Sequence, residues 1–159
     1  MSLVIRAASP GEEDSILSLL RALAEYEKLL DRFHITKAVI TRDYLGAEPR
    51  IRCDLAFEDG RAVGIATWYW TYSSFAAERG IYLEDLFVLP EFRGRGHGKA
   101  LLKHLAAMAV KNGGGKVEWS VLSWNKPSID FYEGIGAERM TDWLIYRLTG
   151  EALEDMADS

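Results

Sequence analysis

Residues 83–99 read Leu-Glu-Asp-Leu-Phe-Val-Leu-Pro-Glu-Phe-Arg-Gly-Arg-Gly-His-Gly-Lys, and this stretch decides the fold. Its first half is a hydrophobic strand that ends near Pro90, and its second half alternates glycine with polar residues. The apolar residues from Leu101 to Ala109 follow at helical spacing, so a helix begins directly after the glycines. Bare backbone N–H groups at the positive end of a helix form an anion site, for which a pyrophosphate is a natural guest.

The spacing of this loop excludes the two common nucleotide-binding loops. A Walker loop needs G-x-x-x-x-G-K-[ST], but Ala100 follows Gly98-Lys99, and Arg93 stands where the first glycine belongs. A dinucleotide fingerprint needs G-x-G-x-x-G, and Lys99 or Leu101 occupies the place of its last glycine. A merely flexible loop is the alternative, but the loop opens a strongly periodic helix.

Outward from this stretch, the chain alternates strands and helices. Ser9-Pro10-Gly11-Glu12 is a capping-box helix start, and Asp59-Gly60 is a hairpin signal. We therefore expect the order β-α-α-β-β-β-α-β-α-β, an α/β (α+β mixed) fold with a central mixed sheet of about six to seven strands flanked by helices. The expected strands are 3–7, 52–57, 63–72, 82–88, 117–122 and 143–148. The first expected helix starts at the cap Ser9 and ends near residues 26–30, and the second starts at the cap Thr36 and stops at Gly46. A third helix runs from the glycine loop to Asn112, and a fourth is expected at 127–133.

The bulk properties restrict the class of protein. A chain of 159 residues favours a single domain, 1–159. A net charge of −5 argues against nucleic-acid binding. The single cysteine, Cys53, lies in an alternating run and is interpreted as a buried strand residue, and the lack of a disulfide pair fits a cytoplasmic protein. No apolar run approaches the ~20 residues of a membrane span, and we expect neither a signal peptide nor a membrane partner. With so few histidines and one cysteine, we expect no metal site.

A second motif, at residues 125–137, narrows the choice of ligand for the glycine loop. Residues 125–132 read Asn-Lys-Pro-Ser-Ile-Asp-Phe-Tyr and are closed by Gly136-Ala137, while the loop itself reads R-x-x-G-x-G from Arg93 to Gly98. The two motifs together resemble the acetyl-CoA site of the GNAT acetyltransferase superfamily. Residues 23–27, 68–72, 81–88 and 124–128 are further similar to the diamine (spermidine/spermine) and thialysine N-acetyltransferases. This resemblance implies a homodimer that transfers acetyl from acetyl-CoA to a primary amine without a metal.

The resemblance also implies roles for matching positions. Glu84 would contact and help deprotonate the amine, and Tyr132 would protonate the departing thiolate. The acetyl-CoA site would comprise Leu86, Phe87 and Val88 through their main chain, then Arg93, Gly94, Arg95, Gly96, His97, Gly98 and Lys99, and finally Asn125, Lys126, Pro127 and Ser128. The amine side would comprise Tyr26, Glu27 and Glu84 with Glu118, Trp119 and Ser120.

The residues themselves support these roles to different degrees. A bound alkylamine must lose a proton before it attacks, and a carboxylate on a strand, such as Glu84, can accept it. Strand alternation predicts that Asp85 faces the other way. The family implies a β-bulge near Leu86–Val88 that frees an N–H for the developing oxyanion. His97 is expected to face solvent or phosphate.

Two observations leave the substrate open. Ser73-Ser74-Phe75 stands where the polyamine enzymes carry an acid and a tryptophan, and the stretch 136–143 is shorter than in that family. The alternatives are a protein or amino-acid N-acetyltransferase on the same fold, a non-catalytic CoA-binding regulatory module, or an unrelated nucleotide-binding domain. Retention of Glu84 and Tyr132 argues against the regulatory module.

Overall fold

The computed structural model describes residues 2–159, and the chain forms two compact units that divide after Ser120. The first unit is built on one five-stranded sheet in the order β1-β2-β3-β4-β5. Its strands are β1 (Leu3–Ala7), β2 (Arg52–Glu58), β3 (Arg61–Ser73), β4 (Glu78–Val88) and β5 (Val117–Glu118). Its helices are α1 (Glu13–Tyr26), α2 (Lys37–Asp43) and α3 (His97–Lys111), with short 3-10 turns at Leu30–Arg32 and Pro90–Phe92.

The strands pair as the local signals predict. The β2–β3 hairpin turns at Asp59 and Gly60, whose φ angles of 49° and 85° are both positive, as a type I′ turn requires. β1 to β4 are antiparallel neighbours, and β5 runs parallel to β4 because α3 connects them. The sheet is therefore mixed, as expected.

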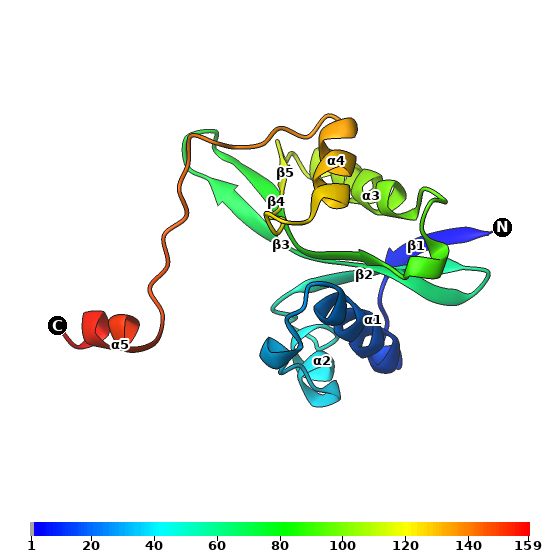
Figure 1. Ribbon diagram of the computed structural model, residues 1–159, viewed down its shortest axis with the longest axis horizontal. Coiled ribbons are helices and arrows are strands. Elements are labelled where there is room, and N and C mark those ends of the chain that lie inside the picture. Colours follow the sequence, from blue (N-terminus) through cyan, green and yellow to red (C-terminus); the bar gives the residue numbers. More distant parts are fainter. Residues whose placement is uncertain (1) are drawn as a thin grey trace. The chain divides into compact units, whose positions relative to one another are not determined.

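Helices cover both faces of this sheet, with α1 and α2 on one face and α3 on the other (Figure 1). The apolar stripe of α1, including Ile16 and Leu20, packs on Leu55, Ile65 and Phe87 of the strands. On the opposite face α3 approaches closely at Gly64, where a Cβ would lie 3.3 Å from Leu101 Cδ1. The site elements are thus held on a well-packed sheet.

Helix starts follow the capping signals. Thr36 caps α2 by accepting a hydrogen bond from Val39 N at 3.2 Å. Glu12 Oε1 accepts one from Ser9 N at 2.6 Å, which is the reciprocal half of the predicted capping box. The predicted helix start at Pro10 is nevertheless wrong, because α1 begins at Glu13 without a side-chain cap bond, and Pro10 and Gly11 form the turn before it.

The second unit, residues 121–159, contains α4 (Lys126–Gly134) and α5 (Gly150–Asp158). The predicted strand over Trp143–Leu148 is wrong, because these residues form no regular element. The predicted strand over 117–122 is also shorter, with only Val117 and Glu118 paired. A β-prone run becomes a strand only where a neighbour accepts its backbone hydrogen bonds, and residues 143–148 have no strand partner within the described chain. The sheet consequently has five strands, fewer than predicted.

Among residues 2–159, no helix combines the length and apolar character needed to cross a bilayer.

Candidate active site

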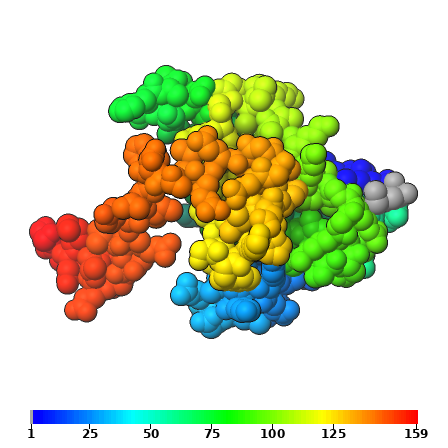
Figure 2. All heavy atoms as spheres, turned by 45° about the horizontal axis from the view of Figure 1, so that its top comes forward, coloured from blue at the N-terminus to red at the C-terminus, as the bar shows by residue number. Residues whose placement is uncertain are grey.

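The glycine loop occupies the turn between β4 and α3. Gly94 and Gly96 have φ angles of 77° and 83°, and nothing lies within 4 Å of where their Cβ atoms would be. Gly96 is also the N-cap of the 15-residue helix α3. Figure 2 shows this loop (green) on the surface of the first unit, and the residues from Arg93 to Gly96 are exposed. The loop therefore offers an open cradle of backbone N–H groups at a helix N-terminus, which fits a pyrophosphate.

The basic side chains of the loop differ in their contacts with the rest of the protein. Arg93 donates from Nε to the Val88 carbonyl at 2.9 Å, and its guanidinium lies over the rings of Tyr26 and Phe87. It therefore joins the loop to the end of β4 and to α1. Lys99 is exposed and has no hydrogen bond or ion pair with the rest of residues 2–159, so its ammonium is available to an anion.

Arg95 and His97 are turned inward. Arg95 Nη1 lies 2.6 Å from Glu58 Oε2, and His97 Nε2 lies 2.8 Å from Glu58 Oε1. The His97 side chain is 0% exposed, so the expectation that it faces solvent or phosphate is wrong. The sequence cannot show this because Glu58 lies 39 residues away, at the end of β2.

The β4 backbone is open beside the loop. β5 pairs with β4 only at Ile81 and Tyr82, so within the described residues the edge of β4 from Leu83 onward has no strand partner on that side. On its other side, Leu86 to Val88 remain paired with β3. This leaves backbone groups of the predicted segment Leu86–Val88 free for an extended ligand.

A β-bulge reshapes the middle of β4. Asp85 pairs with Thr67 and Leu83 pairs with Trp68, so Glu84 is the extra residue. The bulge therefore lies at Glu84 and not at Leu86–Val88, as the resemblance implied. A bulge re-aims side chains, and the expected opposition of Glu84 and Asp85 is wrong, since both carboxylates act on the same phenol, that of Tyr44.

These acidic groups form a cluster with shifted pKa values. Burial raises the pKa of Glu84, and the neighbouring charge of Asp85 raises it further. The same two causes raise the pKa of Glu27. Burial raises the pKa of Asp85, although the hydroxyl of Thr67 donates to it at 2.5 Å and opposes the rise. Burial and the charges of Asp85 and Glu84 help raise the pKa of Tyr44 to about 12. We define Glu27, Glu84 and Asp85 as the acidic cluster.

Sequence reasoning missed one member of the acidic cluster, Asp85, and the neighbouring Tyr44. Asp85 was predicted to face away, and Tyr44 was not predicted at all. No local pattern identifies either of them, because one depends on the bulge and the other on the packing of the segment after α2.

The predicted residues around β5 form local contacts. Ser120 Oγ and Tyr82 Oη lie 3.0 Å apart in a hydrogen bond. Glu118 pairs with Lys116 at 3.3 Å and is exposed. Trp119 is half-buried and also has a partner. These residues remain candidates for the amine side.

The second unit carries the other predicted residues on α4. Asn125 caps this helix by accepting a hydrogen bond from Ser128 N at 3.4 Å, with Pro127 in the first turn. Lys126 pairs with Asp130 one turn later. The ring of Tyr132 lies 5.5 Å from that of Phe131, between centroids. The conspicuous N-x-x-S spacing is therefore first of all a helix cap.

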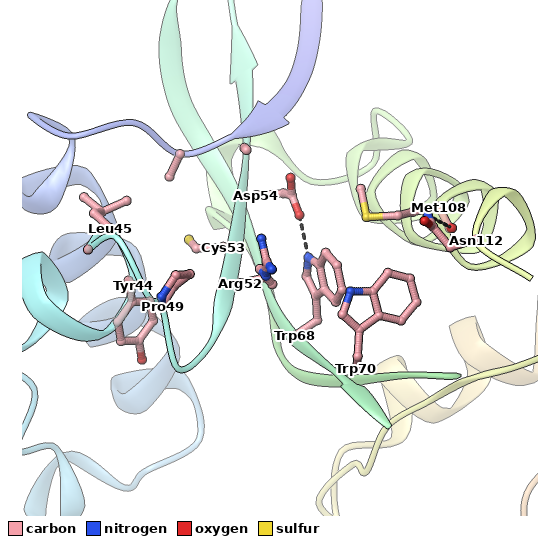
Figure 3. A pocket seen from close by; sticks show the side chains of 13 residues that line it. Tyr44, Leu45, Pro49, Arg52, Cys53, Asp54, Trp68, Trp70, Met108 and Asn112 are labelled. Carbon is pink, nitrogen blue, oxygen red and sulfur yellow. Dashed lines mark hydrogen bonds between the residues drawn. The ribbon is translucent and has the colours of Figure 1, made fainter. Parts of the chain in front are cut away.

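The first unit also contains a cavity of about 430 Å³ at the edge of the sheet where β1 ends (Figure 3). Trp68 Nε1 donates to the buried Asp54 carboxylate at 2.5 Å, and Trp70 packs edge-on against Trp68. Cys53 lines the cavity and is buried, as predicted, and burial raises the pKa of its thiol. None of the residues predicted for the acetyl-CoA site or the amine side lines this cavity. Among the described residues, no group of histidine, cysteine and carboxylate side chains is placed to hold a metal ion.

Comparison with known proteins agrees with this geometry. The Acetyltransferase (GNAT) family model matches residues 16–137. Thialysine N-epsilon-acetyltransferase of Bos taurus is 36% identical over 97% of this chain and 96% of its own. A human spermidine/spermine N(1)-acetyltransferase-like protein is 33% identical over 96% of this chain but only 23% of its own length. An integron cassette protein from the mobile metagenome of V. cholerae has the same fold, with a TM-score of 0.85 at 24% identity over 100% of this chain and 99% of that one. The chain belongs to the GNAT acetyltransferase family and is an N-acetyltransferase, and enzymes of this family use acetyl-CoA as co-substrate.

Proposed function

We propose that this enzyme acetylates a primary amine of a small cationic substrate, a diamine, a polyamine or a lysine analogue. The observation that carries the proposal is the acidic cluster next to the open edge of β4. A cation is attracted to Glu27, Glu84 and Asp85, and the free β4 backbone can pair with the extended arm of the acetyl donor. The curated relatives named for thialysine and for spermidine/spermine support the same class of substrate.

In the proposed reaction the amine nitrogen attacks the thioester carbon, so that a C–N bond forms and the C–S bond breaks. Glu84 accepts the proton of the ammonium, directly or through water. Its raised pKa brings the carboxylate closer to the operating pH, which makes it a better base. Tyr132 donates a proton to the sulfur, and the second proton that the nitrogen loses on forming the amide returns to the Tyr132 phenolate, directly or through water. The products are the N-acetylated amine and the free thiol.

The glycine loop and α4 hold the donor in this proposal. Gly94, Gly96 and the N-terminus of α3 receive the pyrophosphate, and Lys99 adds a cation. Asn125 to Ser128 line the pantetheine side. We propose that the enzyme acts as a cytoplasmic homodimer, which sedimentation at several concentrations would test.

The acceptor specificity is expected to favour short amines. Ser73, Ser74 and Phe75 lie at the tip of the β3–β4 hairpin, and the Phe75 ring is fully exposed. Residues 73–77 of this tip include no acid to hold the far end of a long polycation, and the nearest acid along the chain, Glu78, pairs with Ser73 at the start of β4. We therefore expect thialysine, lysine and small diamines to be better acceptors than spermine.

A thiol-release assay tests the proposed function. Acetyl-CoA is offered with spermidine, thialysine, lysine, a short diamine or a lysine-containing peptide, and free thiol is measured over time. Turnover with the small amines supports the proposal. Turnover with the peptide alone would assign a protein acetyltransferase, and CoA binding without any turnover would assign a regulatory module.

A further inference from the structure

One buried carboxylate on β2 holds two residues of the glycine loop. Glu58 is the last residue of β2, and its side chain is only 6% exposed. Its two oxygens receive different partners, Arg95 Nη1 at 2.6 Å and His97 Nε2 at 2.8 Å. Glu58 precedes the rigid Asp59-Gly60 turn, so the loop is tied to a fixed point of the sheet.

Other contacts also hold the Arg95 guanidinium, whose side chain is 44% exposed. Besides Glu58, its Nη2 lies 3.4 Å from the Glu91 carbonyl, and its carbon lies 5.0 Å from the centre of the Phe92 ring. A guanidinium in this position satisfies a protein carboxylate. It is therefore a poor candidate for the phosphate ligand that its place in the R-x-x-G-x-G motif suggests.

His97 points to the same conclusion. It is the first residue of α3, and its imidazole is buried with Nε2 toward Glu58. Its other nitrogen, Nδ1, is buried without a hydrogen-bond partner in the described chain. The one interaction that orients this ring is the bond to Glu58. The left-handed Gly96 lies between Arg95 and His97, so fixing both neighbours fixes the backbone of the cradle.

We propose that Glu58 is a positioning residue, which holds Arg95 and His97 so that the N–H groups between Gly94 and Gly98 point toward the pyrophosphate. This assignment rests on the proposed use of the loop for acetyl-CoA. It leaves recognition of the phosphate charge to the backbone, the α3 N-terminus and Lys99. Arg95 acts through Glu58.

The test compares CoA, which has the pyrophosphate, with pantetheine, which lacks it. For Glu58→Gln we expect the Kd for CoA, measured by calorimetry, to rise about tenfold, equivalent to about 1.4 kcal/mol. The KM for acetyl-pantetheine and the kcat with acetyl-CoA should change less than about twofold, an order-of-magnitude bound within the scatter of surface substitutions. A purely structural loss would weaken both donors alike.

Asp54→Asn is the matched control. Asp54 is a second buried carboxylate on β2, but its partners are Trp68 and, at 3.4 Å, His104 in the second turn of α3, and not the loop. This variant should leave the Kd for CoA and the KM for acetyl-pantetheine unchanged, even where it lowers thermal stability.

A double-variant cycle separates the two roles of Arg95. If Arg95 acts through Glu58, Arg95→Gln alone should weaken CoA binding no more than Glu58→Gln, which also releases His97, and the double variant should be no worse than Glu58→Gln. Additive losses would make Arg95 a direct phosphate ligand and overturn the proposal. Tighter CoA binding by Glu58→Gln would also overturn it, because Glu58 would then be withholding Arg95 from the phosphate. Arg95 is partly exposed, so its variant remains informative if Glu58→Gln fails to fold. Absence of CoA binding by the wild-type chain would overturn the proposed function itself.

Discussion

Two local features set Glu84 apart from its sequence neighbours. The bulge makes it the extra residue of β4, and burial together with Asp85 raises its pKa. Burial disfavours the charged form of both carboxylates, and the charge of Asp85 further disfavours ionisation of Glu84. Both causes move the pKa of Glu84 upward, toward neutral pH, as the proposed role of Glu84 as a base requires.

Asp85→Asn tests this coupling. Removing the negative charge beside Glu84 should lower the pKa of Glu84, because that charge now helps to raise it. The acidic limb of the profile of kcat/KM against pH should move to lower pH. In Glu84→Gln the loss of activity should shrink as pH rises and free amine accumulates. If the acidic limb of the kcat/KM profile does not move in Asp85→Asn, that limb does not report the ionisation of Glu84.

Tyr132→Phe tests the proposed acid. Without the phenol, thiolate departure loses its proton donor, and we expect kcat to fall by about 10²–10⁴-fold. Binding of CoA should stay within about twofold, since the ring is kept. Tyr72→Phe, which removes an exposed phenol from β3, is the control and should have no effect. An unchanged kcat in Tyr132→Phe would exclude the phenol from the mechanism.

The identities of the site residues were easier to predict than the directions in which their side chains point. Arg95 and His97 were correctly placed in the glycine loop, but their side chains turn to Glu58, which lies in another element. Strand alternation likewise failed at Asp85, because a bulge changes the period without leaving a mark on the sequence. Contacts between distant segments decide such orientations, and a single sequence does not contain them.

At the scale of elements, local chemistry was the reliable guide. Asp59-Gly60 forms the predicted turn and Thr36 the predicted cap, whereas α1 begins three residues after the predicted start at Pro10. These turn and cap signals involve four residues or fewer, so they depend little on how the rest of the chain folds. The run Trp143–Leu148 had the composition of a strand, but pairing is a property of two segments and not of one.

The glycine loop gives a prediction at this scale. Gly96→Ala places a Cβ on a residue with φ of 83°, which costs about 1–2 kcal/mol even though no atom blocks the Cβ. The variant should unfold at a lower temperature and bind CoA more weakly. Gly134→Ala is the control, because Gly134 lies in α4 with open space around it and without a positive φ. Alanine there should raise stability by about 0.5–1 kcal/mol.

At the scale of the whole molecule, the carboxylates divide into two kinds. Glu58, with Arg95 and His97 as partners, has a lowered pKa, so it adds stability at neutral pH that is lost as pH falls through its folded pKa. The pKa of Asp85 is raised by burial, so it lowers stability as pH rises above its ordinary value of 3.8. The ionised, buried carboxylate of Asp85 therefore destabilises the fold at the place where the amine is proposed to bind.

Asp85→Asn and Glu58→Gln should consequently change stability in opposite directions. Asn removes a carboxylate whose ionised form is penalised by burial, so Asp85→Asn should unfold at a higher urea concentration at about pH 8. The gain should be smaller at about pH 4, because near the ordinary pKa of 3.8 the carboxyl of the unfolded chain also begins to bind a proton. Glu58→Gln should be less stable at about pH 8 and approach the wild type in acid. Parallel urea titrations at the two pH values measure both differences. A lower stability of Asp85→Asn at about pH 8 would mean that the bond from Thr67 outweighs the burial of the charge.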